Sequence, residues 1–314
     1  MNSNSDNIDF DSPIFIVGFP RSGTTLLQTM ISTQKNICSF PETHYFSTLD
    51  QHYRLYDKKV DVFFSDLENK IKIKIPLLIK EKFSSTLEND IISKKLLFEE
   101  IVRLLISSQS DIYKSNKIRW VEKSPEHIFH VSTIKEFYPN VKIINIVRYP
   151  LNAIYSWKKN WKDNHSIQAL ANRFKQGEAY FQKFSQSYPD NALTIKYEDL
   201  IKYPNKEISR ISTFLNIEFS SSLLEKNMSR QAKRVIRPDE FWKEKNKSNK
   251  LITDKKDYEW PIIKTLIMQN ILNKELSKFN YHIRYLLFQY LFNMFIFLKK
   301  LLNRTYLFIF FKDE

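Results

Sequence analysis

The sequence predicts an α/β fold in which a parallel sheet is flanked by helices on both faces. Two observations carry this prediction. Short apolar runs alternate with segments whose apolar residues recur at helical spacing, which is typical of βαβ units and a parallel sheet. The chain also has only three glycines, and two of them, Gly18 and Gly23, frame a turn between an apolar run and a helix.

The elements are expected in a fixed order along the chain. Strands are predicted at residues 14–17, 119–122, 141–147 and 193–196. Helices are predicted at residues 24–32, over most of 51–115, after Pro125, after Pro150 and at 167–187. Residues 39–46, around Pro41, are expected to form a loop. The domain organisation predicted is a flexible tail over residues 1–12, one domain over 13–283, and an apolar, basic helical tail over 284–314.

Composition and charge restrict the class of partner. The formal net charge of +14 predicts an anionic partner, such as nucleic acid, a membrane surface or a polyanionic nucleotide. Nucleic acid is not expected, because no basic stripe interleaved with aromatic residues and no zinc-finger motif is present. Cys38 is the single cysteine, so no intramolecular disulfide can form and a reducing, cytoplasmic setting is expected. The first nine residues are polar and acidic, so no signal peptide is expected.

The glycine-framed turn has the composition of a phosphate-binding loop. In such a turn, backbone N–H groups and the positive end of a helix converge on an anion. The residues expected to contact the anion are Pro20, Arg21, Ser22, Gly23, Thr24 and Thr25. The glycine spacing is that of a Walker A loop, but Thr24 stands where that motif has its lysine. Arg148, rather than an acidic residue that would hold magnesium, follows the strand at 141–147.

Four ordered segments carry a family resemblance. Phe19–Leu26 resembles the 5′-phosphosulfate-binding loop of sulfotransferases that use 3′-phosphoadenosine 5′-phosphosulfate (PAPS). Phe40–His44 resembles the segment with the catalytic glutamate in the branch that contains the tyrosylprotein sulfotransferases, and Glu122–Pro125 resembles its lysine-bearing segment. Val147–Ser156 resembles the 3′-phosphate-binding motif. The resemblance runs from residue 13 to about residue 280 and implies a P-loop-type sheet.

The resemblance implies a catalytic role for four residues. Glu42 stands at the position of the general base that takes the proton of an acceptor hydroxyl, and His44 is a second candidate for that base or orients Glu42. Lys123 is expected to contact the sulfonate or the bridging oxygen. Arg21 is expected to fork across the 5′-phosphate and the sulfonate, where it stabilises the leaving oxygen.

The resemblance also assigns the rest of the nucleotide site. Arg148 and Ser156, eight residues apart, are expected to hold the 3′-phosphate, which distinguishes PAPS from ATP. A buried arginine directly after an apolar strand is costly unless an anion accompanies it. Tyr197 is assigned either to the adenine or to core packing. No metal is expected, since His127 and His130 have no evident third ligand.

The C-terminal segment is a separate feature. Residues 285–298 are almost continuously apolar, and residues 306–311 resume the pattern. The first block is shorter than the about 18–20 residues that span a bilayer. The basic residues interspersed with these blocks are Arg284, Lys299, Lys300, Arg304 and Lys312. Two alternatives stay open for residues 284–314: peripheral contact with a membrane, or a terminal helix packed on the domain or on the second subunit of a homodimer.

The expected function is metal-independent transfer of a sulfuryl group from PAPS to the hydroxyl of a glycan, a lipid-linked group, a protein tyrosine or a small alcohol. Two other classes stay open. An ATP-dependent small-molecule kinase would use the same cradle, although the chain lacks the Walker lysine and a strand-end aspartate. A non-catalytic nucleotide- or membrane-binding protein would keep the cradle while Glu42 and Lys123 were dispensable.

Overall fold

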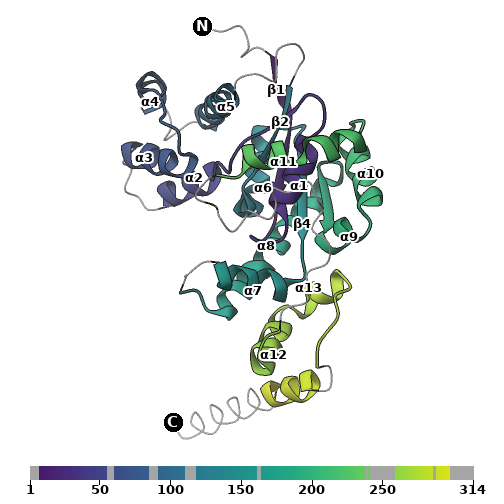
Figure 1. Ribbon diagram of the computed structural model, residues 1–314. Helices are drawn as coiled ribbons and strands as arrows, with labels where there is room; N and C mark the ends of the chain where they lie inside the picture. Colours follow the sequence, from purple (N-terminus) through teal and green to yellow (C-terminus); the bar gives the residue numbers. More distant parts are fainter. Residues whose placement is uncertain are drawn as a thin grey trace, which may run out of the picture. The chain divides into compact units, whose positions relative to one another are not determined.

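The computed structural model describes residues 7–54, 60–84, 91–109, 118–160, 164–237, 240, 259–285 and 288–297 (Figure 1). These residues form a five-stranded sheet in the order β2-β3-β1-β4-β5, in which every strand pair is parallel. The strands are β1 (Ile8–Val17), β2 (Ile37–Ser39), β3 (Ile118–Lys123), β4 (Lys142–Val147) and β5 (Ala192–Lys196). The predicted parallel α/β sheet is thus confirmed.

Helices connect the strands much as the apolar spacing predicts. The helices among the described residues are α1 (Thr24–Ser32), α2 (Tyr45–Arg54), α3 (Val60–Ile71), α4 (Leu77–Ser84), α5 (Ile91–Ser107), α6 (Val131–Phe137), α7 (Pro150–Asn160), α8 (Ile167–Ser187), α9 (Tyr197–Lys202), α10 (Pro204–Leu215), α11 (Ser221–Val235), α12 (Ile262–Ile271) and α13 (Asn273–Lys278), with 3-10 helices η2 (Pro125–His130) and η3 (Pro189–Asn191). Residues 288–297 are also helical. Within the described ranges, no helix is both long enough and apolar enough to cross a membrane.

The first strand is longer than predicted. β1 begins at Ile8, so residues 8–12 belong to the sheet and the predicted tail over 1–12 is too long. Ile8 and Asp9 pair with β3 before a register shift that ends at Ile14. At this irregularity the Asp9 carboxylate accepts a hydrogen bond of 2.9 Å from the backbone N–H of Asp11. The polar residues at the shift interrupt the apolar run, which is why the sequence pattern placed the start of the strand later.

A short edge strand was also missed. The sequence predicted a loop over residues 39–46, but Ser39 ends β2 and Tyr45 begins α2. Three residues are too few to show a periodic pattern, although Cys38 in this strand is fully buried. The Ser39 hydroxyl donates to the carbonyl oxygen of Val121 on β3 at 2.9 Å. Only residues 40–44 remain as the loop between β2 and α2.

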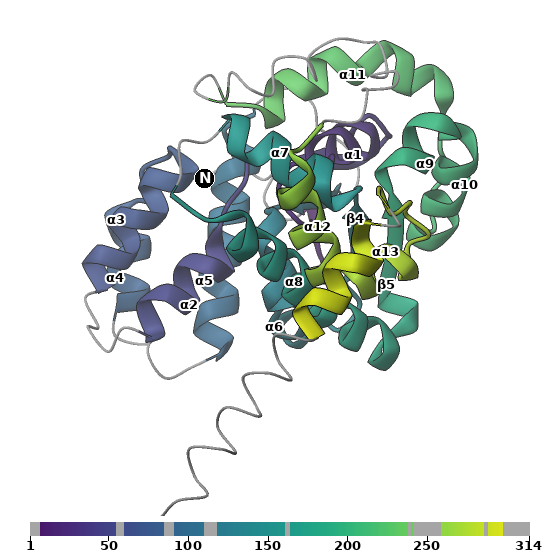
Figure 2. The same cartoon turned by 90° about the horizontal axis from the view of Figure 1, so that it is seen from below.

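Two hydrophobic cores cover the two faces of the sheet, because alternate residues of β1 point in opposite directions. Ile14 and Ile16 pack with residues of α1, α10 and α11. Phe15 and Val17 pack with residues of α2, α3, α5 and α6. Figure 2 shows α2, α3, α4 and α5 gathered on one flank.

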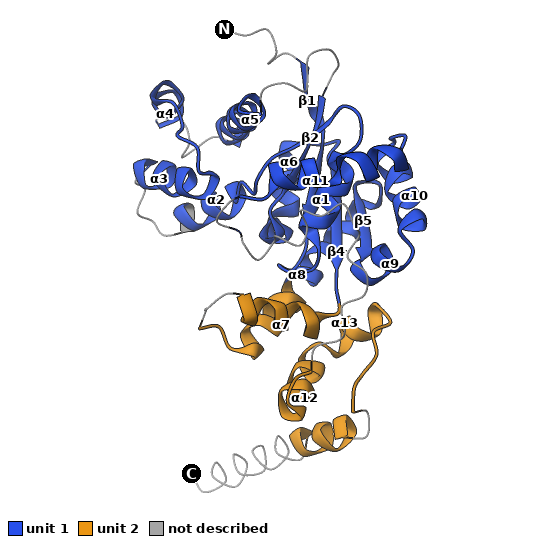
Figure 3. Ribbon diagram, in the orientation of Figure 1, with its two compact units in different colours: residues 1–148, 177–255 blue, residues 149–176, 256–314 orange. Residues whose placement is uncertain are grey.

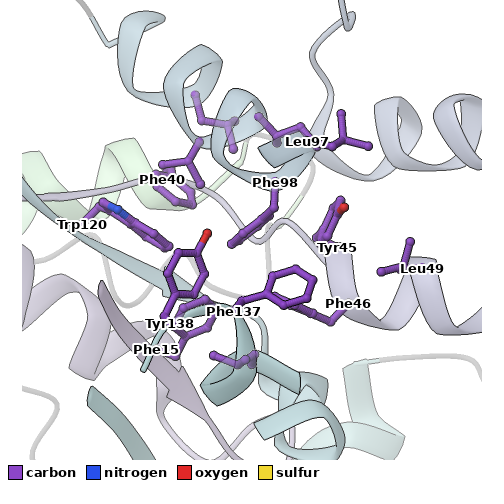
Figure 4. Packing of buried hydrophobic residues seen from close by; sticks show 14 of the residues in the cluster. Phe15, Phe40, Tyr45, Phe46, Leu49, Leu97, Phe98, Trp120, Phe137 and Tyr138 are labelled. Atoms are coloured by element: carbon purple, nitrogen blue, oxygen red, sulfur yellow. The ribbon is translucent and has the colours of Figure 1, made fainter. Parts of the chain in front are cut away.

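The second of these cores is built largely from aromatic rings (Figure 4). Phe15 on β1 and Trp120 on β3 make an edge contact with ring centroids 5.6 Å apart. The ring centroid of Phe98 on α5 lies 4.8 Å from that of Tyr45 and 5.1 Å from that of Phe46. Tyr45 and Phe46 are the first two residues of α2. The start of α2, and with it the end of the 40–44 loop, is therefore held firmly against the sheet by packing.

The chain divides into two compact units (Figure 3), where the sequence predicted one domain over residues 13–283. Unit 1 comprises Met1–Arg148 and Gly177–Lys255, and it contains the whole sheet. Unit 2 comprises Tyr149–Gln176 and Lys256–Glu314. Inside unit 2, the Trp260 indole N–H donates to the Leu151 carbonyl oxygen at 3.0 Å.

Candidate active site

The glycine-framed loop follows β1 directly, and its glycines are required by its shape. Gly18 has φ 145° and Gly23 has φ 101°, a region that side chains disfavour. A Cβ on Gly18 would lie 2.5 Å from the carbonyl oxygen of Ile146, and a Cβ on Gly23 would lie 2.5 Å from the ring of Tyr197. The loop backbone therefore lies so close to β4 and α9 that a side chain at Gly18 or Gly23 would clash with them.

The same loop has the features of an anion cradle. Gly23 caps α1 with left-handed backbone and no side-chain hydrogen bond, so the first N–H groups of the helix point out of its end. The Ser22 hydroxyl oxygen is buried and, among the described residues, has no hydrogen-bond partner. Thr24 and Thr25 are also buried. A bound phosphate would satisfy the Ser22 hydroxyl and the helix end together.

Arg148 is held against this loop. It follows β4, is only 5% exposed, and donates from Nη1 to the carbonyl oxygen of Arg21 at 3.1 Å. Its guanidinium carbon lies 4.8 Å from the centre of the Tyr197 ring. Tyr197 itself belongs to the apolar core beneath the loop, so its position agrees with the packing alternative. A buried cation at the rim of an anion cradle is what a polyanionic ligand requires.

A second cluster forms where the 40–44 loop meets the end of β3. The Lys123 side chain is fully buried and forms an ion pair with Glu42. His44 Nε2 lies 3.1 Å from the other carboxylate oxygen of Glu42. His44 also has φ 52°, which is uncommon for a residue with a side chain. The structure therefore brings together three of the four residues to which the family resemblance assigned a catalytic role.

The segment that carries Lys123 is hydrogen-bonded to the glycine-framed loop. Lys123 on β3 is the parallel-strand partner of Ile16 on β1. Ile16 stands two residues before Gly18. The backbone N–H of Gly18 then donates to the Pro125 carbonyl oxygen at 3.2 Å. Because parallel strands end at the same edge of the sheet, β1 delivers the cradle and β3 delivers Lys123 side by side.

A buried network, which the sequence analysis did not identify, supports the cluster from below. The Glu122 carboxylate is fully buried and accepts hydrogen bonds from the hydroxyls of Thr43 at 2.8 Å and Ser124 at 2.6 Å. His127 Nδ1 lies 3.0 Å from its second oxygen. The backbone N–H of His44 donates to the Ser124 hydroxyl at 3.0 Å. Glu122 therefore ties the segment bearing Glu42 to the segment bearing Lys123.

The charge of Glu122 is stabilised by these neighbours. Burial opposes ionisation of the carboxyl, but the nearby His127 and the hydrogen bonds from Ser124 and Thr43 outweigh it, so the pKa of Glu122 lies below its ordinary value. An acidic residue directly before Lys123 at the end of a buried strand was the available sequence signal. In the sequence analysis, Glu122 appears only as the first residue of the Glu122–Pro125 segment.

Ser156 and Arg148 lie in different units of the chain. Ser156 lies in α7 of unit 2 and is 7% exposed, while Arg148 closes the first segment of unit 1. The shared 3′-phosphate site of Arg148 and Ser156 therefore stays a prediction, since each unit is described by itself. Over the described ranges, no group of three or more His, Cys, Asp or Glu residues is placed to hold a metal ion.

The family model described as "Sulfotransferase family" matches residues 13–221, which contain the cradle, Glu42, Lys123 and Arg148. The chain belongs to the sulfotransferase family. A sequence relative, a "Putative protein-tyrosine sulfotransferase" of Caenorhabditis briggsae, is 22% identical over 69% of this chain and 69% of its own length.

Solved structures agree with the sulfotransferase fold. The sulfotransferase domain of the olefin synthase of Synechococcus PCC 7002 is similar with a TM-score of 0.57 and 21% identity, over 88% of this chain and 97% of that domain. The sulfotransferase domain of the curacin biosynthetic pathway is similar with a TM-score of 0.51 and 19% identity, over 87% of this chain and 99% of that domain. Family and fold together support sulfuryl transfer as the general activity of this sulfotransferase.

Proposed function

We propose that the protein transfers a sulfuryl group from PAPS to a hydroxyl group of an acceptor, with Glu42 as the general base. The observation that carries the proposal is the join between the two clusters: the Gly18–Pro125 hydrogen bond sets the cradle beside the strand end where Lys123 meets Glu42. A base, a cation and an anion cradle thus share one edge of one sheet.

Under this proposal, each residue of the candidate site has a defined role. PAPS supplies an activated sulfuryl group, whose bond to the 5′-phosphate breaks as the acceptor oxygen bonds to sulfur. Glu42 accepts the proton of the acceptor hydroxyl, which makes the oxygen a better nucleophile. Lys123 and Arg21 offset the negative charge that grows on the leaving oxygen. Ser22 and the N–H groups at the start of α1 hold the 5′-phosphate, and Arg148 binds the 3′-phosphate.

The contact between Lys123 and Glu42 has a chemical consequence for this proposal. The contact holds the Glu42 carboxylate beside the buried Lys123 ammonium. A bound sulfonate that shares the charge of Lys123 would weaken this ion pair and free the carboxylate to bind the acceptor hydroxyl. His44, 3.1 Å from Glu42, is placed to orient the carboxylate.

The proposed donor is tested by calorimetric binding of adenosine 3′,5′-bisphosphate against ADP, both without magnesium. We expect the 3′-phosphorylated nucleotide to bind at least about tenfold more tightly, and Arg148→Ala to remove that preference. Lys206→Ala, which removes one exposed positive charge from α10, serves as the control and leaves binding unchanged. Equal binding of both nucleotides, or a preference for ADP with magnesium, would contradict the proposal and favour the kinase.

A further inference from the structure

The helix formed by residues 288–297, called the apolar helix below, exposes most of its large side chains. The six apolar residues that are each between 51% and 68% exposed are Phe288, Tyr290, Leu291, Met294, Phe295 and Phe297. Single exposed apolar residues are common on proteins, but a cluster on three turns of one helix marks an interaction surface.

Gln289 lies on the protein-facing side of the apolar helix, and the exposed Asn293 lies one turn further along. Gln289 is 6% exposed and donates to the Asn293 side-chain oxygen at 2.9 Å. The same oxygen accepts a hydrogen bond of 2.7 Å from Asn270 on α12, which belongs to the same unit. A surface helix of a globular protein normally turns its apolar stripe inward. Here Phe292 and Ile296 are partly buried on the side of Gln289, whereas the six exposed apolar side chains point away from it.

The charges around the apolar helix are all of one sign. From residue 284 to residue 312 the sequence has five basic residues and no aspartate or glutamate. Arg284 precedes the apolar helix, and Lys299 and Lys300 follow it closely in sequence. Two copies of such a segment would repel each other, whereas an anionic surface would attract both. Segments that lie at the headgroup boundary of a lipid bilayer are typically rich in aromatic and basic residues, as this segment is.

We propose that the apolar helix docks in the plane of an anionic lipid surface. Its aromatic and aliphatic side chains enter the boundary between headgroups and acyl chains, and the flanking cations contact the headgroup phosphates. The hydrogen bond from Asn270 of α12 joins the helix to unit 2 before contact, which reduces the ordering that accompanies binding. The apolar helix belongs to unit 2, whereas Glu42 and Lys123 belong to unit 1.

The proposal is tested by sedimentation of the full chain with vesicles of phosphatidylcholine alone or with about 30% phosphatidylserine. We expect binding to the anionic vesicles only, weakened by salt. Phe288→Ser/Leu291→Ser/Phe295→Ser should reduce it by about tenfold or more. The matched control is Leu77→Ser/Leu78→Ser at the start of α4, which removes two residues that are each 73% exposed and should leave binding unchanged.

A second pair of variants tests the charge contribution. Lys299→Glu/Lys300→Glu should weaken vesicle binding about tenfold, while Lys206→Glu/Lys226→Glu, the same change of charge on α10 and α11, should not. Binding of adenosine 3′,5′-bisphosphate shows that each variant is folded. The proposal is overturned if the wild type binds neither vesicle, if it binds both equally, or if the serine variant binds as the wild type does. It is equally overturned if the wild type ignores vesicles and forms dimers that the serine variant does not.

Discussion

The end of β3 and the apolar helix differ in what they bury. At the end of β3, Glu122 and Lys123 are charged and lie inside the protein. In the apolar helix, phenylalanine and leucine side chains are exposed. Both arrangements reverse the usual distribution of charged and apolar residues. The difference is in where the compensation lies: Glu122 and Lys123 have partners inside the chain, and the apolar helix gains its proposed partner from outside.

This difference predicts opposite responses to mutation. A buried charge whose partner is removed has nowhere to find solvent, so changes at the end of β3 should affect folding, catalysis or both. An exposed apolar residue makes few contacts to lose, so changes in the apolar helix should alter binding and leave the folded state intact.

The largest effect is expected at Glu42. Glu42→Gln removes the base but keeps the size of the side chain, so kcat for sulfuryl transfer should fall by about 10²–10⁴. Turnover of labelled sulfate measures the loss, and binding of adenosine 3′,5′-bisphosphate should persist. His44→Gln is the matched variant and should cost less activity. The reverse order of the two variants would assign the base to His44.

The next largest effect is expected at Glu122. Glu122→Ala leaves His127 and two hydroxyls without their common acceptor, so the free energy of unfolding should fall by about 3–5 kcal/mol. Urea denaturation measures it. Glu225→Ala, which removes an exposed carboxylate on α11, should change stability little. If both variants unfold at the same urea concentration, the buried network does not stabilise the site.

The pH dependence of the unfolding free energy tests whether partners inside the protein stabilise a buried charge. Burial opposes the charge of Glu68, but hydrogen bonds from Lys74, Lys80 and the Ile75 N–H outweigh it and lower its pKa to about 2 from 4.5. A lowered folded-state pKa gives stability that is present above pH 4.5 and is lost as the pH falls toward 2. Glu68→Gln should therefore flatten the fall of unfolding free energy in that window. An unchanged slope would show that the three partners do not stabilise the carboxylate.

The smallest effect on folding is expected in the apolar helix. Without vesicles, the serine variant at Phe288, Leu291 and Phe295 should differ from the wild type by no more than about 0.5 kcal/mol per site. Thermal unfolding measures this. A loss of several kcal/mol would show that these side chains pack against the protein, and the contrast with the end of β3 would then disappear.

The sequence predicted the parallel sheet and the glycine-framed turn well because both depend on local patterns. Gly18 and Gly23 stand out in a chain with so few glycines, and the strands on either side are continuous apolar runs. β2 was missed because three residues carry no period. The start of β1 was missed because Asp9 and Asp11 at the register shift resemble a polar tail.

The Glu122 network illustrates what a single sequence does not reveal. Thr43 and Ser124 are far apart in the chain, and each is an ordinary polar residue beside a proposed catalytic one. Only the pairing of β2 with β3 brings them to one carboxylate. The family resemblance implied separate roles for Glu42 and Lys123, whereas their ion pair and the network below it are seen only in the tertiary structure.

Cys38 allows the loop that carries Glu42 to be followed by a chemical probe. The only thiol of the chain is buried in β2, a strand at the edge of the sheet that leads directly into the loop carrying Glu42. A thiol reagent can reach it only when this edge strand separates from β3. The rate of labelling in native buffer would therefore report how often the edge opens, and slower labelling on addition of nucleotide would show that ligand binding and edge opening are coupled.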